Sequence, residues 1–354
     1  MEQERLEQRL REALAEIRGA DRERSDQALR HWDAVAKPLH GLGELEGLVA
    51  RMAGTAPLRR ELKKAVAVFC ADNGVVAQGV TQTDSSVTAV VAGNMRTGRS
   101  SVCCMARTAG AVVLPVDAGM LAEVEGLRSI KTARGTRDLS VEPAMERGEA
   151  VSVLLGGMEI AGELAGEGYT LLAAGEMGIG NTTTTSAVAA ALLERPAWEM
   201  TGKGAGLSDA GLERKIQVID RALALHRPDP ADPIGVLSKV GGFDIAAMAG
   251  FYLGCALHRV PVILDGYISG AAALIAARLC PAAADVLLPS HLSAEPGAGL
   301  VIEALGLRPL LRLGMALGEG TGAVSLMPLI DMALGVYFDM PSFDGIGIEA
   351  YKPL

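Results

Sequence analysis

Residues 169–185, YTLLAAGEMGIGNTTTT, decide the fold. An apolar run leads into Gly175, Gly178 and Gly180, and a run of threonines then opens the apolar stretch SAVAAALLE. This order predicts a buried strand, a glycine loop and the capped start of a helix. Glycines let backbone approach a ligand, and a helix N-terminus attracts anions. The stretch therefore predicts an anion site, although a plain capped turn would have the same pattern.

The same succession recurs along the chain. Short apolar runs that end in Gly or a polar residue alternate with helical patterns. Besides the run that begins at Tyr169, there are four: AVAVFCADNG (65–74), AVVLPVDAG (111–119), VPVILDG (260–266) and DVLLPSHLS (285–293). Such alternation is typical of a mostly parallel sheet covered by helices on both faces, so an α/β fold is expected. Ligands of these sheets bind beyond the carboxyl ends of the strands. We therefore expect one crevice among the polar residues that end the runs: Asp72, Asp117, Glu176, Asp265, Ser290, His291 and Ser293.

Helical patterns occupy both ends of the chain. Apolar residues at three- and four-residue spacing predict helices within residues 1–53, and a further helix is expected to begin near Ser208. Two more helical stretches are predicted near the C-terminus, on either side of the sequence Gly318-Glu-Gly-Thr-Gly322.

Composition excludes several functional classes. The chain has 354 residues, 49% of them apolar, a mean hydropathy of +0.28 and a net charge of -9, which favours a globular protein and argues against a nucleic-acid partner. The charged N-terminus and the lack of an apolar run of about 18 residues argue against a signal peptide and a membrane span, so a cytoplasmic location is expected. The five cysteines show no metal spacing and the histidines are scattered, so no metal and no cofactor is predicted.

Two glutamates stand in glycine-rich segments. Glu319 lies between Gly318 and Gly320, and apolar helices on both sides would desolvate it and favour a general base, although an exposed turn glutamate would look the same. Glu176 belongs to a loop that reads GxxGxG rather than GxGxxG and lacks the lysine of a Walker A loop, which disfavours a dinucleotide or P-loop site. No GxSxG elbow accompanies His291, so a serine hydrolase is also disfavoured.

Lys215 and Ser293 are candidates for holding a phosphate. Lys215 is expected early in a helix that follows a glycine-rich loop, and Ser293 precedes another glycine-containing helix start. A solvent-exposed lysine and a simple serine cap are the plainer alternatives.

In combination, these motifs resemble the nicotinate-nucleotide:dimethylbenzimidazole phosphoribosyltransferase family. The resemblance runs in order over nearly the whole chain and is carried by KPLHGLGELEGLVARMAG (37–54), ADNGVVAQGVT (71–81), GEMGIGNTTTTSA (175–187), GGFDIAAMAG (241–250), VPVILDGYISGAAALIA (260–276), LPSHLSAEPGA (288–298) and LRLGMALGEGTGA (311–323).

The resemblance implies a reaction and its residues. Nicotinate mononucleotide would give its 5-phosphoribosyl group to a benzimidazole-type base, with Glu319 as the general base. Positions lining the nucleotide site would be Glu176, Gly178, Gly180, Asn181, Thr182, Lys215 and Ser293, and we expect Gly175 and Asp265 to contact substrate as well. Val90 stands where family members that use dimethylbenzimidazole commonly carry glutamine, so the acceptor could also be a purine or a phenol.

The resemblance also implies architecture and assembly. A Rossmann-like domain would span residues 61–322, and a smaller helical domain would combine residues 1–60 and 323–354. The enzyme would be a homodimer. A non-catalytic nucleotide-binding subunit is the alternative, which Glu319 disfavours because a binding protein has no use for a general base.

Overall fold

The structure, a computed structural model, describes residues 2–351 and has a six-stranded parallel sheet at its centre. The strands are β1 (Lys64–Ala71), β2 (Ala111–Gly119), β3 (Arg128–Ser129), β4 (Leu171–Met177), β5 (Val262–Leu264) and β6 (Leu287–Pro289). Their order is β3-β2-β1-β4-β5-β6, so the predicted α/β fold is confirmed. Each predicted apolar run supplies one strand, whereas β3 is too short to leave a sequence signal.

Strand β1 is the centre of the sheet. Lys64 is in register with Ala111 of β2 on one side and with Leu171 of β4 on the other, and every pairing is parallel. The chain adds strands outward from β1 in one direction and then, beginning with β4, in the other. In open α/β sheets such a reversal of strand order opens a crevice at the carboxyl ends of the strands, which is where the glycine loop follows β4.

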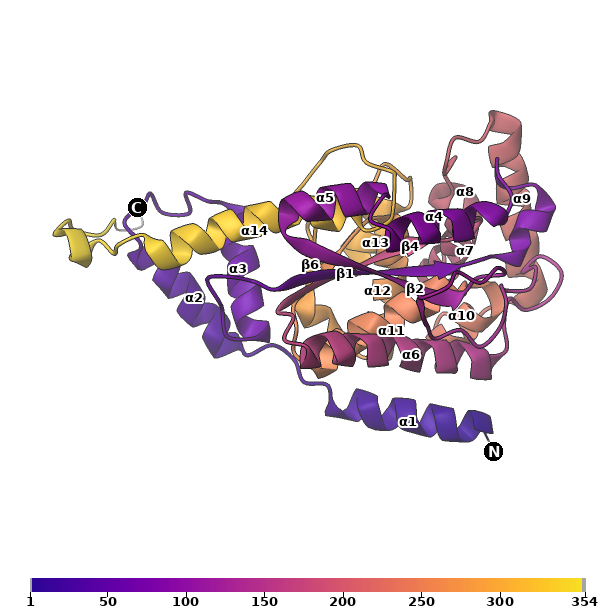
Figure 1. Cartoon of the computed structure of the whole chain (residues 1–354), viewed down its shortest axis with the longest axis horizontal. Coiled ribbons are helices and arrows are strands. Elements are labelled where there is room, and N and C mark those ends of the chain that lie inside the picture. Colours follow the sequence, from indigo (N-terminus) through magenta and orange to yellow (C-terminus); the bar gives the residue numbers. More distant parts are fainter. Residues whose placement is uncertain (1, 352–354) are drawn as a thin grey trace.

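Helices cover both faces of the sheet (Figure 1). They are α1 (Glu2–Glu16), α2 (Arg22–Ala34), α3 (Glu44–Thr55), α4 (Ser86–Arg96), α5 (Ser101–Ala109), α6 (Arg147–Gly166), α7 (Asn181–Leu193), α8 (Ala197–Met200), α9 (Asp209–His226), α10 (Pro233–Val240), α11 (Phe243–Leu257), α12 (Tyr267–Leu279), α13 (Ala298–Ala304) and α14 (Thr321–Asp339). Short 3-10 turns span Gly74–Gln78, Pro281–Val286 and Asp344–Ile346.

The two faces of β1 belong to separate cores. Ala67 and Phe69 pack into the layer that contains α6, α11 and α12, while Val66 and Val68 pack into the layer that contains α3, α5 and α14. Because successive strand residues point to opposite faces, a strand buried on both sides reads as a continuous apolar run. This explains why the runs in the sequence show no polar alternation.

Both chain ends are helical, as predicted. Helix α1 lies along α6, where Arg147 pairs with Glu7 at 3.1 Å (Figure 1). Helices α2 and α3 lie beside α14, where the rings of Trp32 and Tyr337 meet edge to face with centroids 5.0 Å apart. Helix α14 also packs on the sheet through Ala323 and Met327, so the division into residues 1–60, 61–322 and 323–354 stays a prediction.

Helix α14 is the one helix within residues 2–351 that is long and apolar enough to cross a membrane. Half of it is buried inside the protein, which is typical of a core helix.

The helix predicted just before Gly318 is wrong. Between α13 and Gly318 the chain forms no helix, and Leu310 and Leu311 donate their N–H groups to the Ser290 carbonyl at 3.0 and 2.9 Å. Ala294 N–H likewise donates to the Met315 carbonyl at 3.1 Å. Pro309 interrupts the apolar pattern, and the segment after β6 supplies the hydrogen-bond partners that a helix would otherwise provide. Tertiary contacts therefore override a periodicity that looked helical.

Candidate active site

The acids and the glycine loop meet in one cleft of about 230 Å³ at the carboxyl ends of β4, β5 and β6. Eight residues predicted from the sequence line it: Glu176, Gly178, Asn181, Thr182, Asp265, His291, Ser293 and Glu319. A second cavity of about 280 Å³ lies at the amino ends of β1, β4 and β5 and has no acid in its wall. Catalytic chemistry needs polar groups that converge, so the first cleft is the candidate site.

The glycine loop has the predicted strand, loop and helix order. Gly180 precedes α7 with a φ of 92°, and a Cβ there would lie 3.0 Å from Val76 and 3.2 Å from Asn73. Both the positive φ and the lack of space require glycine. Thr182 follows in the first turn of α7, where the helix dipole favours negative charge.

Lys215 is not the solvent-exposed lysine that its sequence context allowed. It lies in α9, is fully buried, and donates from Nζ to Thr182 Oγ1 at 2.8 Å and to the Gly202 carbonyl at 3.2 Å. Burial lowers its pKa to about 8. Its ammonium therefore stands directly behind the threonine that lines the cleft, although Lys215 itself does not line it.

Glu176 is a buried acid in the cleft wall. It ends β4 with 7% of its surface exposed, and its Oε2 accepts a hydrogen bond from Asn181 Nδ2. Burial, reinforced by the nearby Asp244 and Asp265 carboxyls, raises its pKa to about 8. A carboxyl that is neutral in the free protein near pH 7 becomes an anion when positive charge comes close, because the cation favours the charged form.

Glu319 has an unusual backbone. Gly318, Glu319 and Gly320 have φ angles of 85°, 61° and 88°, so three consecutive residues are left-handed. For a glutamate this conformation costs about 1–3 kcal/mol and persists only where the surroundings impose it. The strain marks Glu319 as a residue whose position matters.

The two glutamates are linked directly. Glu319 N–H donates to the Glu176 carbonyl at 3.3 Å, and Glu319 Oε2 accepts from Val102 N–H at 3.1 Å. Val102 is in the first turn of α5, so a helix N-terminus faces the Glu319 carboxylate. Both carboxyls line the same cleft, as the sequence hypothesis requires.

Gly175 and Val90 do not line the cleft. Gly175 is buried in β4, and a Cβ there would collide with the Glu319–Gly320 peptide, so its lack of a side chain serves the close approach of the Glu319 loop. Val90 is 63% exposed on α4. Substrate contacts for these residues, and for Gly180, stay predictions.

Asp72 and Asp117 do not share the crevice either. Asp72 Oδ2 accepts from Leu121 N–H at 2.8 Å, and Asp117 Oδ1 accepts from Met120 N–H at 2.9 Å and from Gly119 N–H at 3.1 Å. Both carboxyls therefore hold the backbone that follows β2, because buried N–H groups need acceptors.

Sequence reasoning placed His291 at the crevice without a catalytic role, and it missed Asp244, Met315 and Leu317. His291 lines the cleft, with its Nε2 3.9 Å from Asp265 Oδ1, and burial lowers its pKa. Asp244, fully buried in the first turn of α11, acts on Glu176 through its charge. Met315 and Leu317, in the non-helical segment before Gly318, also line the cleft. Asp244, Met315 and Leu317 left no comparable signal in the sequence, because their positions depend on long-range packing.

Comparisons with known proteins identify the family of this chain. A family model described as "Phosphoribosyltransferase" matches residues 17–348. Nicotinate-nucleotide--dimethylbenzimidazole phosphoribosyltransferases of Ruminiclostridium cellulolyticum and Chloroflexus aggregans are 44% and 45% identical, each over 97% of this chain and 99% of their own. The crystal structure of CobT from Thermus thermophilus superposes with a TM-score of 0.88 at 41% identity, covering 93% of this chain and all of that one. The chain therefore belongs to the nicotinate-nucleotide:dimethylbenzimidazole phosphoribosyltransferase family.

Proposed function

We propose that this enzyme transfers the 5-phosphoribosyl group of nicotinate mononucleotide to a ring nitrogen of a benzimidazole-type base. The products are nicotinate and an α-ribazole 5'-phosphate, the nucleotide of the cobamide lower ligand. The relatives' names support this assignment, since they specify nicotinate nucleotide and dimethylbenzimidazole as the reacting pair.

The chemistry makes two demands on the protein. The pyridinium nitrogen of nicotinate mononucleotide already carries positive charge, so nicotinate leaves without a general acid, and ribose C1 becomes electron-poor. A carboxylate beside the ribose stabilises that positive charge. The incoming azole must lose its proton, which requires a general base within reach of its nitrogen.

The single observation that carries the proposal is the pairing of Glu176 and Glu319 in one cleft, joined by the 3.3 Å hydrogen bond between their backbones. Glu176 is assigned to the developing cation, which would pull its buried carboxyl into the charged form. Glu319 is assigned to the azole proton.

The phosphate is assigned to the glycine loop and the start of α7. Gly178, Asn181 and Thr182 supply backbone and side-chain donors near the N-terminus of α7, and Lys215 supplies a positive charge behind Thr182. Ser293, half-buried in the cleft wall, adds a hydroxyl. Few cations are needed, which is consistent with an acidic protein that binds a phosphate.

The acceptor is proposed to be dimethylbenzimidazole, with purines and phenols as the alternatives that Val90 leaves open. The test is to incubate the protein with nicotinate mononucleotide and each base and to follow free nicotinate and the α-ribotide by chromatography. We expect release that requires a base and is fastest with dimethylbenzimidazole. Glu319→Gln should lower turnover at least 100-fold while leaving nicotinate mononucleotide binding intact. Full turnover in that variant would remove Glu319 as the base.

We propose a cytoplasmic homodimer as the working form. Large apolar side chains are exposed on α14 and the segment after it, namely Met332, Phe338, Met340, Ile346 and Ile348. A second copy of the chain would cover them. Light scattering of the purified protein tests this, because Met332→Glu should convert a dimer to a monomer.

A further inference from the structure

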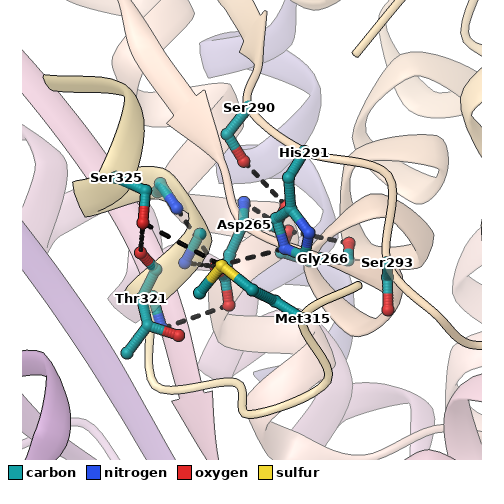
Figure 2. Close-up of polar contacts among 12 residues, drawn as sticks. Asp265, Gly266, Ser290, His291, Ser293, Met315, Thr321 and Ser325 are labelled. Atoms are coloured by element: carbon teal, nitrogen blue, oxygen red, sulfur yellow. Dashed lines mark hydrogen bonds and ion pairs between the residues drawn. The ribbon is translucent and has the colours of Figure 1, made fainter. Parts of the chain in front are cut away.

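The side chain of Asp265 is turned toward the loop that carries Glu319. Asp265 follows β5 and is 5% exposed. Its Oδ2 accepts from Gly320 N–H at 3.1 Å, and its Oδ1 accepts from Gly322 N–H at 2.6 Å and Ala323 N–H at 3.1 Å. Figure 2 shows Asp265 between the Thr321 end of α14 and His291. One carboxylate thus satisfies three of the backbone donors at the start of α14.

Asp265 is itself held firmly. Ser290 Oγ donates to the Asp265 carbonyl at 3.0 Å, and Asp265 N–H donates to Ser269 Oγ at 2.8 Å, so its backbone is tied to the end of β6 and to α12 (Figure 2). The Asp265 carboxylate is therefore fixed relative to the sheet, and its hydrogen bonds fix the loop relative to the sheet as well. A flexible acceptor in the same place would not do so, because it would move together with the loop.

The Gly318–Gly320 loop must be stabilised by contacts from the surrounding structure. Its three left-handed residues, Gly318 to Gly320, include a glutamate that would leave this conformation if the surroundings allowed it. The Glu176 carbonyl, Val102 N–H and the tight contact with Gly175 also hold this segment, and Thr321 bonds the Gly318 carbonyl locally. The Asp265 carboxylate adds three hydrogen bonds, one to Gly320 N–H and two to the first turn of α14. Oδ1 accepts two hydrogen bonds and Oδ2 accepts one, so backbone N–H groups use three of the roughly four acceptor sites of this carboxylate.

We propose that Asp265 is a positioning residue, which holds the Gly318–Gly320 loop so that the Glu319 carboxylate stays over the cleft, rather than a ligand of the substrate. This rests on the proposed function of Glu319 as the general base. It replaces the substrate contact that the sequence predicted for Asp265.

The test compares Asp265→Asn with the wild-type enzyme. The amide keeps the shape but places an NH₂ donor against backbone N–H groups, which releases the loop. We expect kcat to fall about 10- to 100-fold, because a displacement of about 1 Å in a catalytic group costs a factor of this size. The Kd for nicotinate mononucleotide, measured by calorimetry, should stay within about twofold. Amide hydrogen exchange in a peptide spanning residues 316–324 should accelerate at least 10-fold.

Two further variants keep the test decisive. Asp265→Ser retains an acceptor in a smaller side chain and is measured in parallel, in case the asparagine variant folds poorly. Asp232→Asn is the matched control, since Asp232 also accepts an N–H at a helix start, from Gly235 at 3.1 Å, but does not line the cleft. This control should lose stability and keep kcat.

The results separate this inference from the proposed function. If Asp265 acts through Glu319, Asp265→Asn lowers kcat in the wild type but no further in the Glu319→Gln background. If Glu319→Gln is fully active, the base assignment fails, yet hydrogen exchange still reports whether Asp265 holds the loop. Unchanged exchange in Asp265→Asn overturns the positioning role. Unchanged exchange with a Kd raised at least 10-fold would make Asp265 a substrate ligand.

Discussion

Replacing Gly175 by alanine puts one methyl group between β4 and the Glu319 loop. The added Cβ would lie 2.5 Å from the Glu319 carbonyl oxygen, whereas ordinary contact begins at 3.4 Å. The loop must therefore retreat by about 0.9 Å, because Gly175 sits in a strand paired on both sides. Overpacking of this kind costs about 1–3 kcal/mol of folding stability.

The effect on turnover follows from the same displacement. A misplacement of about 1 Å at a catalytic group costs roughly 100-fold, so we expect kcat to fall about 10- to 100-fold in Gly175→Ala. Nicotinate mononucleotide should bind as before, because Thr182 and Lys215 stand in α7 and α9. The assay is nicotinate release at saturating dimethylbenzimidazole, with calorimetry for nucleotide binding and thermal unfolding for stability.

Gly47→Ala is the matched control. Gly47 lies in α3, and a Cβ there would meet nothing within 4 Å, so alanine should leave kcat unchanged and raise stability by a few tenths of a kcal/mol or more. Wild-type kcat in a folded Gly175→Ala protein would refute the interpretation that the missing side chain at Gly175 is needed for the position of the Glu319 loop. Lost nucleotide binding with normal turnover would instead restore Gly175 as a substrate contact.

Three further changes probe the rest of the cleft. Burial raises the pKa of Glu176 from 4.5 to about 8, so the stability tied to its bound proton is complete below pH 4.5 and is lost as the pH rises through 8. In urea unfolding, the stability of Glu176→Gln relative to the wild type should therefore increase between about pH 5 and 8. A constant difference in stability would mean that Glu176 is ionised in the folded protein. Lys215→Met should weaken nicotinate mononucleotide binding about 10- to 100-fold but leave binding of the phosphate-free riboside unchanged. An equal loss of affinity for both ligands would show that Lys215 has a structural role. Val90→Gln should raise the ratio of kcat/KM for dimethylbenzimidazole over adenine roughly fivefold, and an unchanged ratio would remove position 90 from base selection.

Local order along the chain made much of the site predictable. A buried strand followed by glycines and a helix cap specifies the Gly178 to Thr182 loop, because backbone freedom and capping act over a few residues. Glu176 and Glu319 were found for the same reason, since each stands inside a glycine-rich segment. In contrast, the helix predicted before Gly318 failed, because the hydrogen bonds that hold Leu310 and Leu311 come from Ser290.

The sequence by itself determined the α/β class, the strand runs, the glycine loop and, through resemblance, the family and the candidate glutamates, since all of these are written in local patterns and motifs. Only the tertiary structure decided what each polar side chain does. In the structure, Asp265 hydrogen-bonds the start of α14, and Lys215 is buried behind Thr182. Asp72 and Asp117 lie outside the cleft. The physical reason is that a buried carboxyl or ammonium must hydrogen-bond with the donors and acceptors that packing places beside it. Those partners lie far away in the chain.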